Sequence, residues 1–172
     1  LLMGKCVLRT ACQEKKKWQD QGLAKIRMGV NLSLRQFHNN DLLNLVESVL
    51  KETKLAPQYL ELEITETIAM KEKSYIINTL NAFRQIGVSI AIDDFGTEYS
   101  SLSYLKHLPV DRLKVAMQFI RGIGIDVIAE GVETKEQLEF LKNHNCDEIQ
   151  GYYFFKPLAE AEMTKLLITY NK

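Results

Sequence analysis

The chain has 172 residues, of which 46% are apolar and 26% are charged, a composition typical of one globular domain with a hydrophobic core. Lys and Arg together number 22, as do Asp and Glu, and the resulting zero net charge argues against binding DNA through a basic surface. No apolar run approaches the roughly 18 residues that a membrane span needs, so we expect no membrane contact from this segment.

The predicted strands and helices alternate along most of the chain. In chain order, we expect a helix at Cys6–Asp20, a strand at Met28–Ser33, a helix at Asp41–Lys51, a strand at Leu60–Thr65, a helix at Lys73–Ile86, strands at Val88–Asp94, Asp111–Ala116 and Asp126–Gly131, a helix at Thr134–Asn143, a strand at Glu148–Phe154 and a helix at Ala159–Tyr170. Asp41 and Thr134 are expected as N-caps, and Gly87 is expected to end a helix. The alternation indicates parallel strands with helical crossovers, which fits both an open doubly wound sheet and a closed (β/α)8 barrel.

One connection is shorter than this pattern requires. Only Met117–Ile125 separates two predicted parallel strands, whereas a crossover with a packed helix takes about a dozen residues or more. Either this helix is deleted from the protein or its residues are missing from the sequence, and we favour the second explanation. The chain also does not begin with Met, so we interpret it as a fragment of a longer protein.

The cysteines indicate the compartment. Cys6, Cys12 and Cys146 are too few and too scattered for a disulfide framework, and none forms a Cys-x-x-Cys pair that could hold zinc. The first residues also lack the features of a signal peptide. We therefore expect a cytoplasmic protein, or the cytoplasmic part of a membrane-anchored one.

Polar side chains gather at the predicted strand ends, with Gln150 placed inside the last strand: Asn31, Glu63, Glu66, Asp93, Asp94, Lys114, Glu130, Glu133 and Gln150. Taken singly, each is accounted for by a helix cap, a turn or a solvated position. Taken together, they would converge on one rim of a barrel or sheet, where active sites lie. Crowded carboxylates repel each other, and a bound cation relieves that repulsion.

An oxygen-only set of Asn, Glu and Asp without Cys or His favours Mg²⁺ or Mn²⁺ over zinc. Two such ions sharing an Asp would suit the cleavage of a phosphate ester. A lysine beside them could hold or help to deprotonate a water molecule, or neutralise phosphate charge.

The sequence resembles the EAL domain over nearly its whole length, residues 1–172. The resemblance is carried by Asn31-Leu32-Ser33 with Gln36, Glu63-Ile64-Thr65-Glu66, Asp93-Asp94-Phe95-Gly96-Thr97, Tyr99-Ser100-Ser101-Leu102, Leu108-Pro109-Val110-Asp111 with Leu113-Lys114, Ala129-Glu130-Gly131-Val132-Glu133-Thr134 and Gln150-Gly151-Tyr152. It implies an α/β fold, a modified (β/α)8 TIM-type barrel with one antiparallel strand. We expect that barrel to be incomplete here, without its first strands and one internal helix.

The resemblance also implies a phosphodiesterase that cuts cyclic di-GMP to linear pGpG with two Mg²⁺ or Mn²⁺ ions. Its implied metal ligands are Asn31, Glu63, Asp93, Asp94 and Glu130, with Lys114 and Glu130 catalytic, Gln36, Glu133 and Gln150 binding substrate, and Glu66 anchoring the loop after Asp94. That loop, Phe95–Ser101, would help to form a homodimer. Fusion to sensor or GGDEF domains is also expected.

Two positions depart from the family pattern and favour a different interpretation. Glu98 replaces a usual glycine, and Ala116 stands where an aspartate commonly follows the lysine. The alternative is a catalytically inactive EAL module that binds cyclic di-GMP or a protein partner as a sensor. A third and weaker alternative is an unrelated barrel enzyme acting on an enolate or a sugar phosphate.

Overall fold

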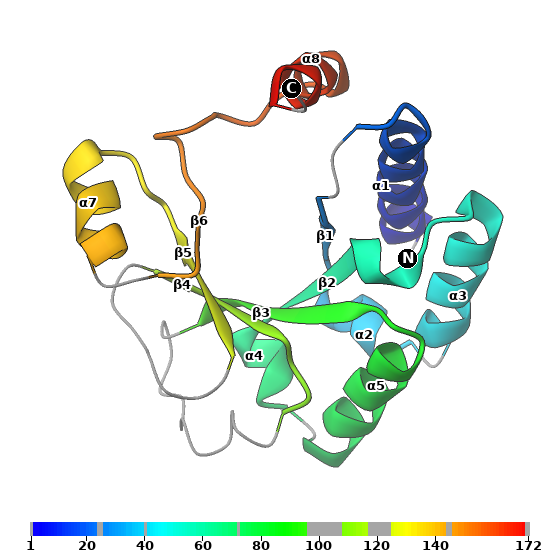
Figure 1. Cartoon of the computed structure of the whole chain (residues 1–172). Coiled ribbons are helices and arrows are strands. Elements are labelled where there is room, and N and C mark those ends of the chain that lie inside the picture. The colour runs from blue at the N-terminus through cyan, green and yellow to red at the C-terminus, as the bar shows by residue number, and fades with distance from the viewer. Residues whose placement is uncertain are drawn as a thin grey trace. The chain divides into compact units, whose positions relative to one another are not determined.

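The fold alternates helices with strands for most of its length (Figure 1). The computed structural model describes residues 2–23, 26–39, 41–71, 73–95, 108–116, 125–143 and 146–170. The elements are α1 (Leu2–Asp20), β1 (Met28–Asn31), α2 (Leu34–Phe37), α3 (Leu42–Thr53), the 3-10 helix η1 (Pro57–Tyr59), β2 (Leu60–Thr65), α4 (Glu66–Ala69), α5 (Lys73–Gln85), β3 (Ser89–Phe95), β4 (Arg112–Ala116), β5 (Asp126–Glu130), α7 (Lys135–Asn143), β6 (Glu148–Ile149) and α8 (Glu160–Tyr170). In the described part of the chain, no helix combines the length and apolarity of a membrane span.

The strands form one sheet in the order β1-β2-β3-β4-β5-β6, which is their order along the chain. The pairs β1–β2, β3–β4, β4–β5 and β5–β6 are parallel, as predicted, and the antiparallel strand that the resemblance implies is not among them. The last strand is wrong in its extent, because β6 ends at Ile149 rather than at Phe154. Residues 117–124, where we expected a missing helix, lie outside the described residues.

The chain divides into two compact units. The first takes its described residues from Leu1–Glu63, Asn81–Ser89 and Leu158–Lys172, and the second from Ile64–Leu80 and Ile90–Pro157. In the first unit, α1 lies against α3 and β1. Leu8 and Cys12 of α1 and Val46 and Val49 of α3 are buried. The same unit includes α8. The indole of Trp18 in α1 donates a hydrogen bond of 2.9 Å to the hydroxyl of Thr164 in α8.

In the second unit, aspartates just before two strands bind the neighbouring strands. The Asp111 carboxylate accepts a hydrogen bond of 2.9 Å from the Ile90 N–H, and the Asp147 carboxylate accepts one of 3.0 Å from the Val127 N–H. These bonds satisfy backbone donors near the starts of β3 and β5. The apolar face of α7 packs onto the loop and strand before it through the buried side chains of Ala129, Val132, Leu138 and Leu141.

The structure confirms two of the three predicted helix ends in full. Thr134 is the N-cap of α7, because its hydroxyl accepts a hydrogen bond of 3.3 Å from the Gln137 N–H. Gly87 follows α5 with a φ of 86°, which confirms its predicted role. Asp41 precedes α3 but makes no side-chain cap hydrogen bond. The short helices α2 and α4 were not predicted, because four residues are too few to show helical periodicity.

The cysteines differ sharply in exposure, and we expect their reactivity to follow. Burial raises the pKa of the Cys12 thiol to about 11, whereas Cys6 is exposed. Because the thiolate is the reactive form, iodoacetamide at pH 8 should alkylate Cys6 in the folded protein and leave Cys12 unmodified until denaturant is added. Peptide mass spectrometry measures both sites. Equal labelling rates for the two cysteines in the native protein would contradict the burial of Cys12.

Candidate metal centre and active site

The end of β3 is irregular at the predicted Asp93-Asp94 pair. Ile92 aligns with Leu113 of β4 while Phe95 aligns with Val115, so β3 covers three residues where β4 covers two. Asp94 has a φ of 54°, in the left-handed region, and its N–H donates a hydrogen bond of 3.0 Å to the Asp93 carboxylate. A regular strand directs consecutive side chains to opposite faces, whereas a bulge redirects them.

The bulge brings both aspartates to Glu130, the last residue of β5. One carboxylate oxygen from each of Asp93, Asp94 and Glu130 lies within 4.8 Å of the other two. Asp94 is exposed, and the other two are partly buried. Three carboxylates this close fit a hard divalent cation, because carboxylate oxygens are its preferred ligands and its charge offsets their repulsion.

A buried lysine lies beside this acidic cluster. Lys114 of β4 is only 6% exposed, and its Nζ lies 3.0 Å from Oε1 of Glu130 on the adjacent strand. Lys114 aligns with Ile128, so its side chain pairs with a residue two positions further along β5 when it contacts Glu130. The arrangement places a cationic donor at the edge of the acidic cluster, where it could orient a water molecule or bind a phosphate oxygen.

Two further predicted ligands meet in the first unit, at the ends of β1 and β2. Asn31 and Glu63 are aligned partners in the parallel pair, and Glu63 is 7% exposed. The Glu63 carboxylate lies over Gly29, where a Cβ atom would come within 2.1 Å of Oε1. Sequence reasoning did not single out Gly29, and its position two residues before Asn31 on the same strand face is the signal that could have done so.

Gln36 and Glu66 lie in the short helices α2 and α4. The Gln36 amide oxygen accepts hydrogen bonds from the Ser33 N–H (3.2 Å) and hydroxyl (2.6 Å), which forms a capping box at α2. Glu66, expected at a strand end, is instead the first residue of α4 and is 1% exposed. The loop that it was predicted to anchor, Phe95–Ser101, lies outside the described residues except for Phe95, and Glu98 falls in the part that is not described.

Glu133 and Gln150 lie on loops that follow β5 and β6 and are exposed. The prediction that Gln150 lies inside a strand is wrong. Its N–H donates to the Ala129 carbonyl (2.8 Å) and its own carbonyl accepts from the Val132 N–H (3.2 Å). The chain then turns, because Gly151 packs so closely on Val132 that a Cβ atom would lie 2.2 Å from the Val132 carbonyl oxygen.

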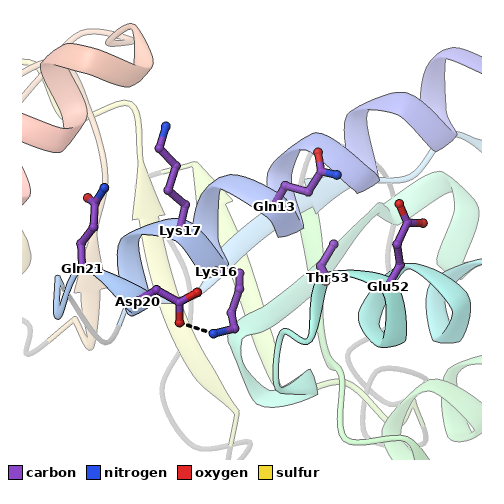
Figure 2. A pocket seen from close by; sticks show the side chains of 7 residues that line it. All are labelled: Gln13, Lys16, Lys17, Asp20, Gln21, Glu52 and Thr53. Carbon is purple, nitrogen blue, oxygen red and sulfur yellow. Dashed lines mark hydrogen bonds and ion pairs between the residues drawn. The ribbon is translucent and has the colours of Figure 1, made fainter.

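A separate open hollow of about 500 Å³ lies beside α1 and α3 and contains none of the predicted site residues (Figure 2). Its lining is polar and charged: Gln13, Lys16, Lys17, Asp20, Gln21, Glu52 and Thr53. Lys16 and Asp20 form an ion pair along α1. These side chains resemble an ordinary solvated helix surface, where exposed ion pairs contribute little to stability.

The parallel strands and the carboxylates at their carboxyl ends are those of an incomplete TIM-like barrel with a candidate metal centre. The sequence model of the EAL domain matches residues 1–124 and 116–157, so the chain belongs to the EAL domain family.

Curated relatives share this similarity over almost the whole chain. Cyclic di-GMP phosphodiesterase NbdA of Pseudomonas aeruginosa is 38% identical over 96% of this chain, which covers 24% of NbdA. The bifunctional diguanylate cyclase/cyclic di-GMP phosphodiesterase MucR of the same species is 36% identical over 94% of this chain, which covers 26% of MucR. The chain therefore spans about a quarter of the length of these relatives.

Solved structures agree in fold. The phosphodiesterase PaMucR in complex with c-di-GMP has a TM-score of 0.89 and 36% identity, covering 94% of this chain and 74% of that one. The EAL domain of Mycobacterium smegmatis DcpA has a TM-score of 0.88 and 34% identity, covering 97% and 84%.

Proposed function

We propose that this protein hydrolyses cyclic di-GMP to linear pGpG with Mg²⁺ or Mn²⁺. The observation that carries the proposal is the acidic cluster of Asp93, Asp94 and Glu130 with Lys114 at its edge. Hydrolysis of a phosphodiester needs an activated water and a counter-charge for the phosphate, and these residue types supply positions for both. Membership of the EAL domain family and the names of its relatives support the choice of substrate.

In this proposal, Asp93, Asp94 and Glu130 in the second unit are ligands of divalent cations. Asn31 and Glu63 in the first unit are proposed as metal ligands because the chain belongs to the EAL domain family. Bound cations would lower the pKa of a water molecule and polarise the phosphate. Lys114 donates hydrogen bonds to that water and limits charge build-up beside Glu130. The remaining proposed contacts are to the dinucleotide, from Gln36, Glu133 and Gln150, with Glu66 as the loop anchor.

The proposal extends to the setting of the domain. We propose that residues 1–172 belong to an EAL phosphodiesterase domain of a longer signalling protein that forms a homodimer. MucR, which is named as a diguanylate cyclase as well as a phosphodiesterase, supports fusion to a sensor or GGDEF domain.

Hydrolysis of cyclic di-GMP by the purified chain tests the function. We expect pGpG to appear on chromatography with Mn²⁺ or Mg²⁺, and no product with EDTA. Ca²⁺ should support little turnover, because its longer, more flexible coordination suits in-line attack poorly. Binding of cyclic di-GMP in calorimetry without any pGpG would contradict the phosphodiesterase and support the inactive sensor module that Glu98 and Ala116 favour.

A further inference from the structure

The loop between β5 and α7, Gly131–Thr134, joins the acidic cluster to a proposed substrate contact. Glu130 precedes the loop, and Glu133 lies within it. The second half of the loop is bound by one side chain from the first turn of α7. Oε1 of Gln137 accepts hydrogen bonds from the N–H groups of Glu133 (2.8 Å) and Thr134 (3.0 Å). The Gln137 N–H in turn donates to the Thr134 hydroxyl. Gln137 therefore links the loop to α7 through three hydrogen bonds.

The first half of the same loop is held independently. Val132 is fully buried, its N–H donates to the Gln150 carbonyl (3.2 Å), and its carbonyl accepts from the Tyr153 N–H (2.8 Å). Gly151 packs directly on the Val132 backbone. Loss of Gln137 would thus release Glu133 and Thr134 while the segment next to Glu130 stays attached to the loop after β6.

We propose that Gln137 is a positioning residue, which sets where the Glu133 side chain projects and so tunes affinity for the dinucleotide rather than the chemical step. This inference rests on the proposed function. The Glu133 side chain is exposed, so its direction follows mainly from its backbone, and two hydrogen bonds to one amide oxygen define that backbone. Preorganised contacts avoid the ordering cost that a mobile loop imposes on binding.

Kinetics of Gln137→Ala and Gln137→Glu test this role. We expect Gln137→Ala to raise KM for cyclic di-GMP about five- to tenfold, with kcat within about twofold of the parent protein. Gln137→Glu keeps an acceptor at the same place and should restore KM to within about twofold. A fall in kcat with unchanged KM, or failure of Glu to restore KM, would overturn the proposal.

Glu136→Ala is the matched control for a general weakening of α7. Hydrogen bonds from its own N–H and from the Thr134 hydroxyl lower the pKa of Glu136, so its carboxylate also caps this helix. The Glu133 N–H donates to Gln137 instead, so we expect removal of the Glu136 carboxylate to leave KM unchanged. If Glu136→Ala raises KM as much as Gln137→Ala does, helix fraying explains the effect and the positioning role is wrong.

Amide hydrogen exchange measured by NMR gives a readout that does not need activity. In Gln137→Ala, exchange of the Glu133 and Thr134 amides should accelerate by about tenfold or more, while the Val132 amide keeps its protection. Unchanged exchange at both amides would overturn the inference. Accelerated exchange in a protein that hydrolyses no cyclic di-GMP would retain the loop contact, reject the proposed function and thereby remove the claimed effect on affinity.

Discussion

Asp93→Asn is expected to reduce metal-dependent hydrolysis of cyclic di-GMP on the order of a thousandfold or more. The substitution keeps the shape of the side chain and removes one negative charge from a cluster whose three oxygens lie within 4.8 Å of one another. A carboxamide is a weaker ligand for Mg²⁺ or Mn²⁺, so both occupancy and the activation of water should fall. Turnover measured over a Mn²⁺ titration separates the two effects, because excess metal restores occupancy only.

Asp126→Asn is the control for this charge change. Asp126 lies on β5, the strand of Glu130, but at its opposite end and exposed to solvent. We expect this variant to keep its activity and its Mn²⁺ dependence. Asp93→Asn with hydrolysis within about tenfold of the parent protein would contradict the assignment of Asp93 as a metal ligand.

Lys114→Met should lower kcat about a hundredfold while KM for the dinucleotide changes by less than about threefold. The aliphatic part of Lys114 is buried, and methionine fills much of the same space, so folding should be preserved. The lost group is the ammonium 3.0 Å from Glu130. Loss of this positive charge does not weaken cation binding by the nearby carboxylates. Because metal occupancy is then not limiting, added Mn²⁺ should not restore turnover.

Lys135→Met controls for the loss of a positive charge, because this side chain is 71% exposed at the start of α7. It should keep both kinetic constants. A parallel loss of rate and of affinity in Lys114→Met would instead indicate that Lys114 binds the ground-state dinucleotide.

Much of the fold follows from local pattern. Short Val- and Ile-rich segments such as Leu60–Thr65 alternate with helices such as Leu42–Thr53, and this alternation alone indicates parallel strands. Because the strands are parallel, Asn31 and Glu63 are expected near the same edge of the sheet, where the strands end. The alignment of Asn31 with Glu63 in the β1–β2 pair confirms this. The last strand could not be predicted so well, because aromatic residues after Gln150 have strand propensity but Gly151 packs against Val132 and the chain turns there.

The site shows the same division between local pattern and tertiary contact. The amino-acid sequence by itself determined which groups are available at the strand ends, since side-chain chemistry and strand polarity are local properties. Only the tertiary structure decided that Asp93 and Asp94 both reach Glu130, because a bulge between aligned β3 and β4 suspends the alternation of side chains. The Gln137 contacts with the loop are local by comparison, since they span only three or four residues. The tertiary structure alone decided that Lys114 pairs with Glu130, because that contact joins two strands separated along the chain.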